Sequence, residues 1–279
     1  MRVSAVQMTS TLDIDRNLRT AQRLMDEAAL DGAKLIALPE LFNRWGCAQD
    51  LRDGAEPLDG PTVTWARDRA AHLGVWLVAG SIIELVEESD RHFDTACLIS
   101  PTGEITAVYR KMHLFQVDVE GTRHDEPSLL LSGDEIVVAE VAELTIGMSI
   151  CFDLRFPELF RIQALRGATV AVVPSAFTAV TGRDHWETLL RARAIENQMF
   201  VIAPNQIGSS SPELSWHGHS SIIDAWGTVL AQAPDEECVI TADLNLDTQR
   251  ETRERLPTLS NRRSNNYQWP DAQVDNKGV

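Results

Sequence analysis

Three residues of the sequence carry side chains suited to nucleophilic catalysis, and each one follows a short apolar stretch. Glu40 follows the run at residues 35–38, Lys111 the run at 105–109, and Cys151 the run at 144–150. A thiol can attack a carbonyl carbon, a carboxylate can take the thiol proton, and a cation can stabilise the resulting oxyanion. If the three side chains meet in the fold, the sequence predicts a cysteine-dependent site for acyl transfer.

Lysine is rare in this chain, which gives Lys111 particular weight. Of the 25 basic residues only three are lysine, and the other two are Lys34 and Lys277. Arg110 directly precedes Lys111, so a positive charge alone does not explain the change of residue type. An ammonium group is compact and can release a proton, whereas a guanidinium cannot. An incidental surface lysine is the alternative interpretation.

The segment around Cys151 has the order of a strand, a sharp turn and a helix. Pro157 suits the first position of that helix. A nucleophile at such a turn is exposed, and the backbone amide of Phe152 can then donate to an oxyanion. Arg155 can bind a substrate carboxylate through two hydrogen bonds. An ion pair between Arg155 and Glu158 is the structural alternative, and a buried cysteine that only packs is the alternative for Cys151.

A Cys–His enzyme is the nearest chemical rival. We considered four of the seven histidines as partners of a thiol: His113, His185, His217 and His219. None of them follows a strand as directly as Glu40 does, so a local polar role is favoured for each. The other three cysteines, Cys47, Cys97 and Cys238, are interpreted as incidental or as core residues. No cluster has the spacing of metal ligands, so no metal or other cofactor is expected.

Apolar runs of strand length alternate with helical patterns along the chain, which is typical of an α/β fold with helices covering the sheets. We predict strands at residues 3–7, 35–38, 75–79, 96–99, 105–109, 136–141, 144–150, 170–173, 200–203, 220–224 and 239–242. We predict helices at residues 13–31, 60–74, 157–166, 184–198 and 246–255, the fourth beginning with a capping box at Asp184 and Glu187. Residues 111–134 are expected to form a long functional loop. No linker divides residues 1–279, so we expect a single domain with residues 256–279 as an arm.

The overall charge excludes several classes of partner. The chain has 279 residues, 44% of them hydrophobic, and a formal net charge of −16. Such a field repels nucleic acids and anionic membrane surfaces. We find neither a signal-peptide pattern nor an apolar run long enough to span a membrane. The sequence therefore predicts a cytoplasmic protein that acts on small molecules.

Several segments in the same order resemble the nitrilase (carbon–nitrogen hydrolase) superfamily. The resemblance is carried by LPE at 38–40, YRKMHLF at 109–115 and CFDLRFPE at 151–158, and it continues through segments at 174–177, 181–182, 185–187, 191–197, 218–220, 226–227 and 256–257. It implies a four-layer α-β-β-α sandwich and a Glu-Lys-Cys triad at Glu40, Lys111 and Cys151. The family's additional glutamate maps to Glu126, although Pro127 follows where relatives usually have serine.

The branch that the chain most resembles contains omega-amidases and deaminated-glutathione amidases. This resemblance implies hydrolysis of the terminal amide of a small carboxylic acid, through a thioester on the cysteine and with release of ammonia. Arg155 and His113 are expected to contact the substrate, although His113 can instead support Lys111 from behind. Alternatives are a nitrilase, an N-carbamoyl amidohydrolase or, from another class, a catalytically idle binding or scaffold protein. The family also implies a homodimer or a higher homo-oligomer.

Overall fold

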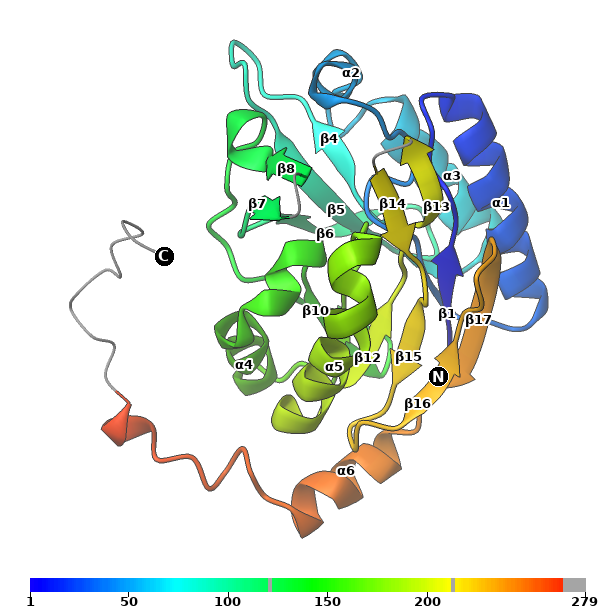
Figure 1. Cartoon of the computed structure of the whole chain (residues 1–279). Helices are drawn as coiled ribbons and strands as arrows, with labels where there is room; N and C mark the ends of the chain where they lie inside the picture. The colour runs from blue at the N-terminus through cyan, green and yellow to red at the C-terminus, as the bar shows by residue number, and fades with distance from the viewer. Residues whose placement is uncertain (120–121, 212–213, 268–279) are drawn as a thin grey trace.

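Two β-sheets pack face to face, and helices cover the outer face of each sheet (Figure 1). This arrangement is seen in a computed structural model, which describes residues 1–119, 122–211 and 214–267. The predicted four-layer α-β-β-α sandwich is therefore confirmed. Within the described residues, no helix is long and apolar enough to cross a membrane.

The first sheet has seven strands in the order β17-β1-β2-β3-β5-β4, with β6 also paired to β5. Its inner strands β1, β2 and β3 are parallel, because the helices α1 and α3 connect them across one face. The strands are β1 (Arg2–Gln7), β2 (Leu35–Ala37), β3 (Trp76–Val78), β4 (Ile82–Glu84), β5 (Phe93–Ile99), β6 (Ile105–Arg110) and β17 (Cys238–Asp243). The helices are α1 (Ile14–Leu30), α2 (Ala48–Asp53) and α3 (Pro61–Leu73).

The second sheet has six strands in the order β16-β15-β12-β11-β10-β9, and α4 and α5 cover its outer face. The strands are β9 (Val138–Val141), β10 (Leu144–Met148), β11 (Val170–Val172), β12 (Phe200–Ala203), β15 (Ser221–Ile223) and β16 (Val229–Gln232). The helices are α4 (Pro157–Leu165), α5 (Ala179–Asn197) and, after the last strand, α6 (Leu246–Arg255).

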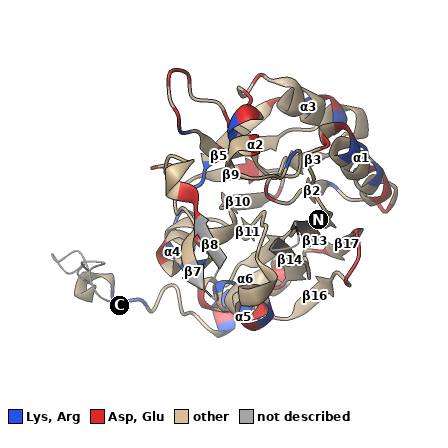
Figure 2. Cartoon of the chain, turned by 45° about the horizontal axis from the view of Figure 1, so that its top comes forward, with Lys and Arg blue, Asp and Glu red and all other residues tan. Residues whose placement is uncertain are grey.

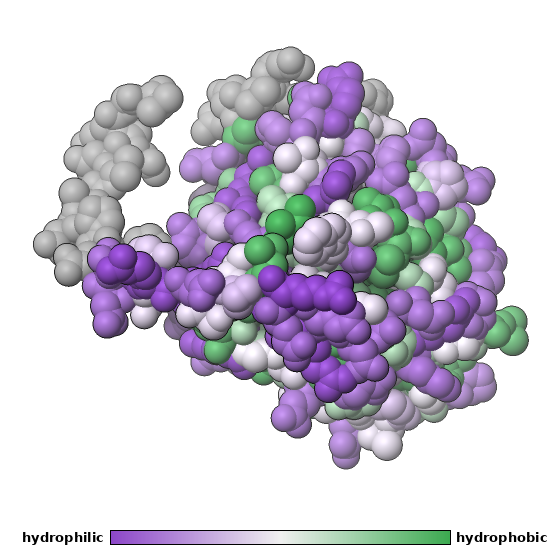
Figure 3. Space-filling view, turned by 90° about the horizontal axis from the view of Figure 1, so that it is seen from below, coloured by the Kyte–Doolittle hydropathy of each residue, from purple (hydrophilic) through white to green (hydrophobic). Residues whose placement is uncertain are grey.

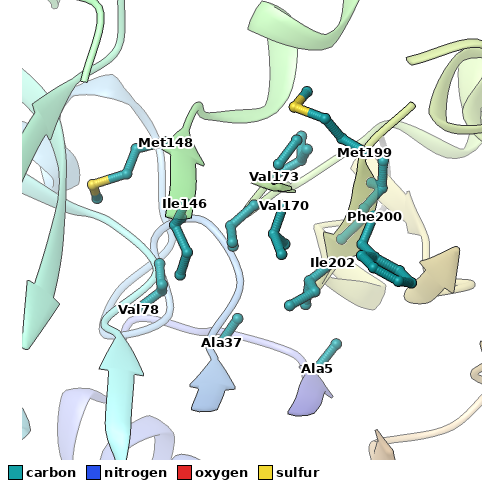
Figure 4. Packing of buried hydrophobic residues seen from close by; sticks show 14 of the residues in the cluster. Ala5, Ala37, Val78, Ile146, Met148, Val170, Val173, Met199, Phe200 and Ile202 are labelled. Carbon is teal, nitrogen blue, oxygen red and sulfur yellow. The ribbon is translucent and has the colours of Figure 1, made fainter. Parts of the chain in front are cut away.

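Alternation along the strands divides the core into two layers. In β2, Leu35 and Ala37 pack against the second sheet, whereas Ile36 packs beneath the helices. Figure 4 shows the layer between the sheets, where Ala37 and Val78 lie opposite residues such as Ile146. Because both faces of these strands are buried, their sequence is continuously apolar rather than alternating. This packing fixes the strand ends that carry the candidate site.

The structure corrects two of the predicted elements. Residues 111–134 do not form one long loop, because they contain the hairpin of β7 (Gln116–Val119) and β8 (Thr122–Asp125) and a short 3-10 helix at Glu126–Ser128. The helix predicted to begin at Asp184 begins at Ala179, so the prediction of a capping box at Asp184 is wrong. Its first turn is stabilised by packing against the hairpin of β13 (Ile207–Ser211) and β14 (Leu214–His217). A Cβ atom at residue Gly182 would lie only 2.4 Å from His217, so a glycine is needed at this close approach.

Charged residues lie mainly on the outer helices, whereas the inner strands carry few of them (Figure 2). The view from below in Figure 3 shows a surface that is mostly hydrophilic, with small apolar patches between the charges. The described part of the predicted arm, residues 256–267, runs away from the body of the domain (Figure 1). Residues 268–279 of that arm lie outside the described residues.

Candidate active site

The ends of β2, β6 and β10 bring Glu40, Lys111 and Cys151 together. The Lys111 Nζ atom lies 2.7 Å from Glu40 Oε1, and the Cys151 thiol lies close enough to the Glu40 carboxylate for that carboxylate to raise the pKa of the thiol. All three residues are buried, with exposed fractions of 2% for Glu40, 1% for Lys111 and 9% for Cys151. The predicted acid, amine and thiol therefore share one site.

Backbone amides hold two carboxylates on either side of the Lys111 ammonium. Lys111 Nζ also donates to Glu126 Oε1 at 2.9 Å. The second oxygen of Glu40 accepts from the Ala176 amide at 2.7 Å, and the second oxygen of Glu126 accepts from the Phe115 amide at 2.6 Å. Each carboxylate thus accepts two hydrogen bonds, which fix its position beside the ammonium.

The backbone bends sharply at Cys151. Its φ of +43° lies in the left-handed region, where a residue with a side chain costs free energy. The surrounding structure must therefore enforce this conformation. The Cys151 amide donates to the Pro174 carbonyl at 2.9 Å, which ties the turn to the end of β11. The Phe152 amide donates to no acceptor among the described residues, and Phe152 lines the cavity. This amide is therefore available to an oxyanion.

The Asp153 carboxylate, which is fully buried, connects the turn at Cys151 to the strand that delivers Lys111. It accepts hydrogen bonds from the Tyr109 hydroxyl at 2.6 Å and from the Ile150 amide at 2.8 Å. It also accepts from the His113 amide, and its Oδ1 lies 2.7 Å from Nδ1 of the His113 ring. That ring stacks on Phe156 at 3.6 Å between centroids. His113 is not among the described residues that line the cavity, so this geometry gives no support to the substrate contact expected for it.

Burial and charge decide the protonation of the thiol, which the sequence alone leaves open. Burial raises the pKa of Cys151, the negative charge of Glu40 raises it further, and Lys111 only partly opposes them. The net pKa is well above that of a free cysteine, so the resting side chain is a neutral thiol. Burial lowers the pKa of Lys111, but the negative charges of Glu126 and Glu40 outweigh it and raise the pKa well above its ordinary value. The amine is therefore a stable ammonium.

A cavity of about 280 Å³ opens beside these groups. Its wall includes a small apolar cluster whose members are Leu41, Leu51, Ile83, Leu129 and Leu130. Aromatic side chains from three separate segments complete it, namely Trp45, Phe177 and Trp216. The cavity wall is thus largely apolar and also carries the thiol and the carboxylates, as expected of a site for a small organic molecule.

Arg155 is the one arginine among the described residues that line this cavity. Its guanidinium lies over the ring of Phe177 at 5.1 Å and 3.2 Å from Nδ1 of His185. Among the described residues no carboxylate forms an ion pair with it, so the alternative pair with Glu158 is not formed. Burial lowers the pKa of Arg155, which shows that the charge is partly desolvated without a compensating anion.

The geometry gives little support to a Cys–His pair, to another cysteine as the nucleophile or to a metal site. No histidine is among the described residues that line the cavity. Cys97 is buried in β5, and burial raises its pKa to about 12. Cys47 is exposed and lines the cavity wall, away from the core. Across residues 1–119, 122–211 and 214–267, no group of three or more His, Cys, Asp and Glu side chains is arranged to hold a metal ion.

Comparisons with known proteins agree with this geometry. The family model for carbon-nitrogen hydrolases matches residues 2–254. The chain belongs to the carbon–nitrogen hydrolase family.

Two similar relatives of this carbon–nitrogen hydrolase are amidases. A deaminated glutathione amidase from Synechocystis is 38% identical over 263 residues, covering 93% of this chain and 97% of that one. The omega-amidase NIT2-B from Xenopus laevis is 37% identical over 267 residues, covering 95% and 96%. The crystal structure of the NitFhit protein from C. elegans superposes with a TM-score of 0.88 at 34% identity, covering 96% of this chain and 66% of that one. The predicted family and its amidase type are confirmed.

Sequence reasoning missed several groups of the hydrolase site. Asp94 lies beside Lys111, with its Oδ2 at 3.6 Å from Nζ, and the amides of Ala176 and Phe115 orient the two glutamates. A signal for Asp94 was present, because a charged residue inside the otherwise apolar strand β5 is unusual. The two amides belong to loops, and nothing in their residue types marks them.

Proposed function

We propose that this protein hydrolyses the terminal amide of a small carboxylic acid through a thioester on Cys151. The observation that carries the proposal is the proximity of the Glu40 carboxylate to both the Lys111 ammonium and the Cys151 thiol, beside a largely apolar cavity. Such a group provides a base, a cation and a nucleophile within reach of one carbonyl.

The first step uses the neutral thiol as its starting point. Glu40 takes the proton from Cys151 as the sulfur attacks the amide carbon, so thiolate forms only when substrate is present. The carbonyl oxygen becomes an oxyanion, which accepts hydrogen bonds from Lys111 Nζ and from the Phe152 amide. When the carbon–nitrogen bond breaks, the protonated Glu40 gives its proton to the leaving nitrogen, and ammonia departs from the thioester.

The second step returns the enzyme to its resting state. Glu40 takes a proton from a water molecule, whose oxygen attacks the thioester carbonyl. The same two donors stabilise the second oxyanion. The carbon–sulfur bond then breaks, the sulfur recovers its proton from Glu40, and the free acid leaves. The balance is one amide and one water converted to one carboxylic acid and one ammonia.

Glu126 is the second carboxylate that accepts a hydrogen bond from the Lys111 ammonium. It accepts from Lys111 Nζ at 2.9 Å and from the Phe115 amide at 2.6 Å, so its position is fixed from two directions. Burial raises the pKa of Glu126, the charge of Lys111 lowers it, and the net direction is upward. We assign Glu126 to the orientation of Lys111 and of the substrate amide nitrogen.

Arg155 supplies the second recognition point of the proposed substrate. Its guanidinium is partly buried and has no carboxylate partner among the described residues, and it lines the same cavity as the thiol, together with several apolar side chains. A substrate with a terminal amide, a short apolar chain and a distal carboxylate satisfies both ends. The two amidases to which the chain is similar support this choice.

Measuring ammonia release from a set of substrates tests the function. We expect hydrolysis of amides that carry a distal carboxylate, with 2-oxoglutaramate and deaminated glutathione as the first two compounds and neutral aliphatic amides as weaker substrates. A preference for nitriles or for N-carbamoyl compounds would replace the amidase by one of the alternatives on the same triad. Absence of turnover with every class would leave the scaffold alternative.

We also propose that the protein works as a homodimer in the cytoplasm. Ile195 of α5 and Trp226 are both exposed, a Cβ atom at the neighbouring Gly227 would lie 2.6 Å from the Ile195 side chain, and residues 256–267 extend away from the domain (Figure 1). A second copy of the chain can cover both features. Light scattering after size-exclusion chromatography tests the dimer, with Trp226→Ser expected to shift it toward monomer. All four cysteines are unpaired, as in proteins of a reducing compartment such as the cytoplasm. Cell fractionation tests this location.

A further inference from the structure

Asp94 is a third carboxyl group beside the Lys111 ammonium, and the reaction proposed above does not use it. It is the second residue of β5 and is 1% exposed. Its Oδ2 atom lies 3.6 Å from Lys111 Nζ, which is beyond hydrogen-bond distance. Its Oδ1 atom is buried without a hydrogen-bond partner among the described residues, although Asp94 lines the cavity. A buried carboxyl with an unpaired oxygen needs a physical explanation.

The charges around Asp94 make three ionised carboxylates an unfavourable arrangement. Glu40 approaches from the end of β2 and Glu126 from the 3-10 helix, while Lys111 approaches from the end of β6. The thiol of Cys151 approaches Lys111 from the turn after β10. The Ser81 hydroxyl is placed to donate a hydrogen bond to Asp94. With one ammonium, three ionised carboxylates would leave two uncompensated negative charges in a buried site, which favours a proton on one of the carboxyls.

Hydrogen bonding identifies which carboxyl keeps it. Glu40 and Glu126 each accept two N–H donors, one from Lys111 and one from the backbone, and both bonds favour the ionised form. Among the described residues, only the Ser81 hydroxyl is placed to donate to Asp94. Burial raises the pKa of Asp94 and the charge of Glu40 raises it further, while Lys111 opposes them without reversing the direction.

An ammonium group has three N–H donors. Two of those of Lys111 are taken by Glu40 and Glu126, which leaves one for the substrate oxyanion. An ionised Asp94 would compete for that donor, whereas a neutral carboxyl at 3.6 Å attracts it only weakly. We propose that Asp94 is a positioning residue that stays protonated during the reaction and thereby leaves the third N–H of Lys111 to the oxyanion.

This inference rests on the proposed function for its kinetic consequence but not for its protonation state. Asn is close to a protonated Asp in shape and is neutral at every pH. We expect Asp94→Asn to keep kcat within about threefold of the unchanged enzyme at neutral pH, because it preserves the neutral side chain. As pH rises and the unchanged enzyme ionises Asp94, its kcat falls, whereas the kcat of Asp94→Asn stays constant through that range.

Infrared spectroscopy of the full chain labelled with ¹³C at the aspartate carboxyl reads the protonation directly. We expect a carbonyl band of a protonated carboxylic acid at neutral pH, which is lost in Asp94→Asn and kept in the matched control Asp184→Asn, whose side chain is exposed. The label reports on the folded, unsubstituted enzyme even if the variant fails to fold. The result is also independent of turnover, so a protein that hydrolyses no amide can still show it. Absence of the band, or a loss of kcat of about 100-fold in folded Asp94→Asn, would overturn the proposal.

Discussion

The Nζ atom of Lys111 lies 2.7 Å from the Glu40 carboxylate, although the two residues are 71 positions apart in the chain. The same carboxylate lies close enough to the Cys151 thiol to raise the pKa of that thiol. Glu40 is therefore placed to exchange a proton with the sulfur while its charge is balanced by the ammonium. This relationship leads to four predictions about the site.

Replacing Glu40 by Gln should change the thiol and the reaction in opposite directions. Glu40 raises the pKa of Cys151, so Glu40→Gln should lower that pKa and increase the thiolate fraction at any given pH below it. Amide hydrolysis should nevertheless fall by about 100-fold or more, because the base is lost. The thiolate absorbance followed against pH measures the first effect and ammonia release the second. The surface variant Glu187→Gln serves as the control. A thiol pKa that stays the same or rises in Glu40→Gln would contradict the prediction.

Replacing Arg155 by Gln should affect only substrates that carry a carboxylate. We expect KM for such amides to rise about tenfold or more, since a hydrogen bond to a charged group contributes about 1.5–3 kcal/mol. KM for a neutral aliphatic amide should be unchanged. Steady-state kinetics of both substrates with Arg155→Gln and with the exposed control Arg183→Gln decide it. Equal losses for charged and neutral amides would show that Arg155 acts on the structure of the site instead.

The strained turn at Cys151 predicts an unusual order of stability. At its φ of +43°, Ala is disfavoured but Gly is not. The free energy of unfolding of Cys151→Gly should therefore equal that of Cys151→Ala or exceed it by up to about 1 kcal/mol. In the helix α1 the control change Ala29→Gly should instead cost about 1 kcal/mol. Urea unfolding of the three variants tests this, and a Cys151→Gly protein clearly less stable than Cys151→Ala would refute the strain.

The Tyr109 hydroxyl should stabilise both the fold and the geometry of the site. It donates to the buried Asp153 at 2.6 Å, and burial raises its pKa well above the ordinary value, so it remains a donor at alkaline pH. Tyr109→Phe should lower the free energy of unfolding by about 1.5–3 kcal/mol. It should also reduce kcat more than it changes KM, because the Lys111 strand and the Cys151 turn lose a common anchor. Tyr267→Phe, which removes an exposed hydroxyl, is the control; equal behaviour of the two variants would contradict the role of Asp153.

Much of the fold and the reactive groups could be predicted because they depend on local patterns. Continuous apolar runs mark the buried strands β2 and β10, and Glu40 and Cys151 lie shortly after them, while Lys111 follows the antiparallel strand β6. The helix α1 begins after Asp13 and ends near Gly32, as its caps predict.

The parts that could not be predicted depend on contacts between distant segments. The first turn of α5 exists because Gly182 packs against His217, which no local pattern records. The position of His113, two residues after Lys111, suggests a contact with the substrate. Its ring is instead held by Asp153, which belongs to another element. Asp94 was overlooked because its function depends on the number of charges meeting at Lys111, which is known only when the strands are in place.

The thioester on Cys151 is the central claim, and mass spectrometry of enzyme quenched in acid during turnover tests it most directly. We predict that a peptide containing Cys151 gains the mass of the substrate acyl group, and that Cys151→Ala, although folded, shows neither the adduct nor ammonia release. Hydrolysis at the normal rate by Cys151→Ala, or turnover of the unchanged enzyme with the acyl group on another residue, would contradict the mechanism.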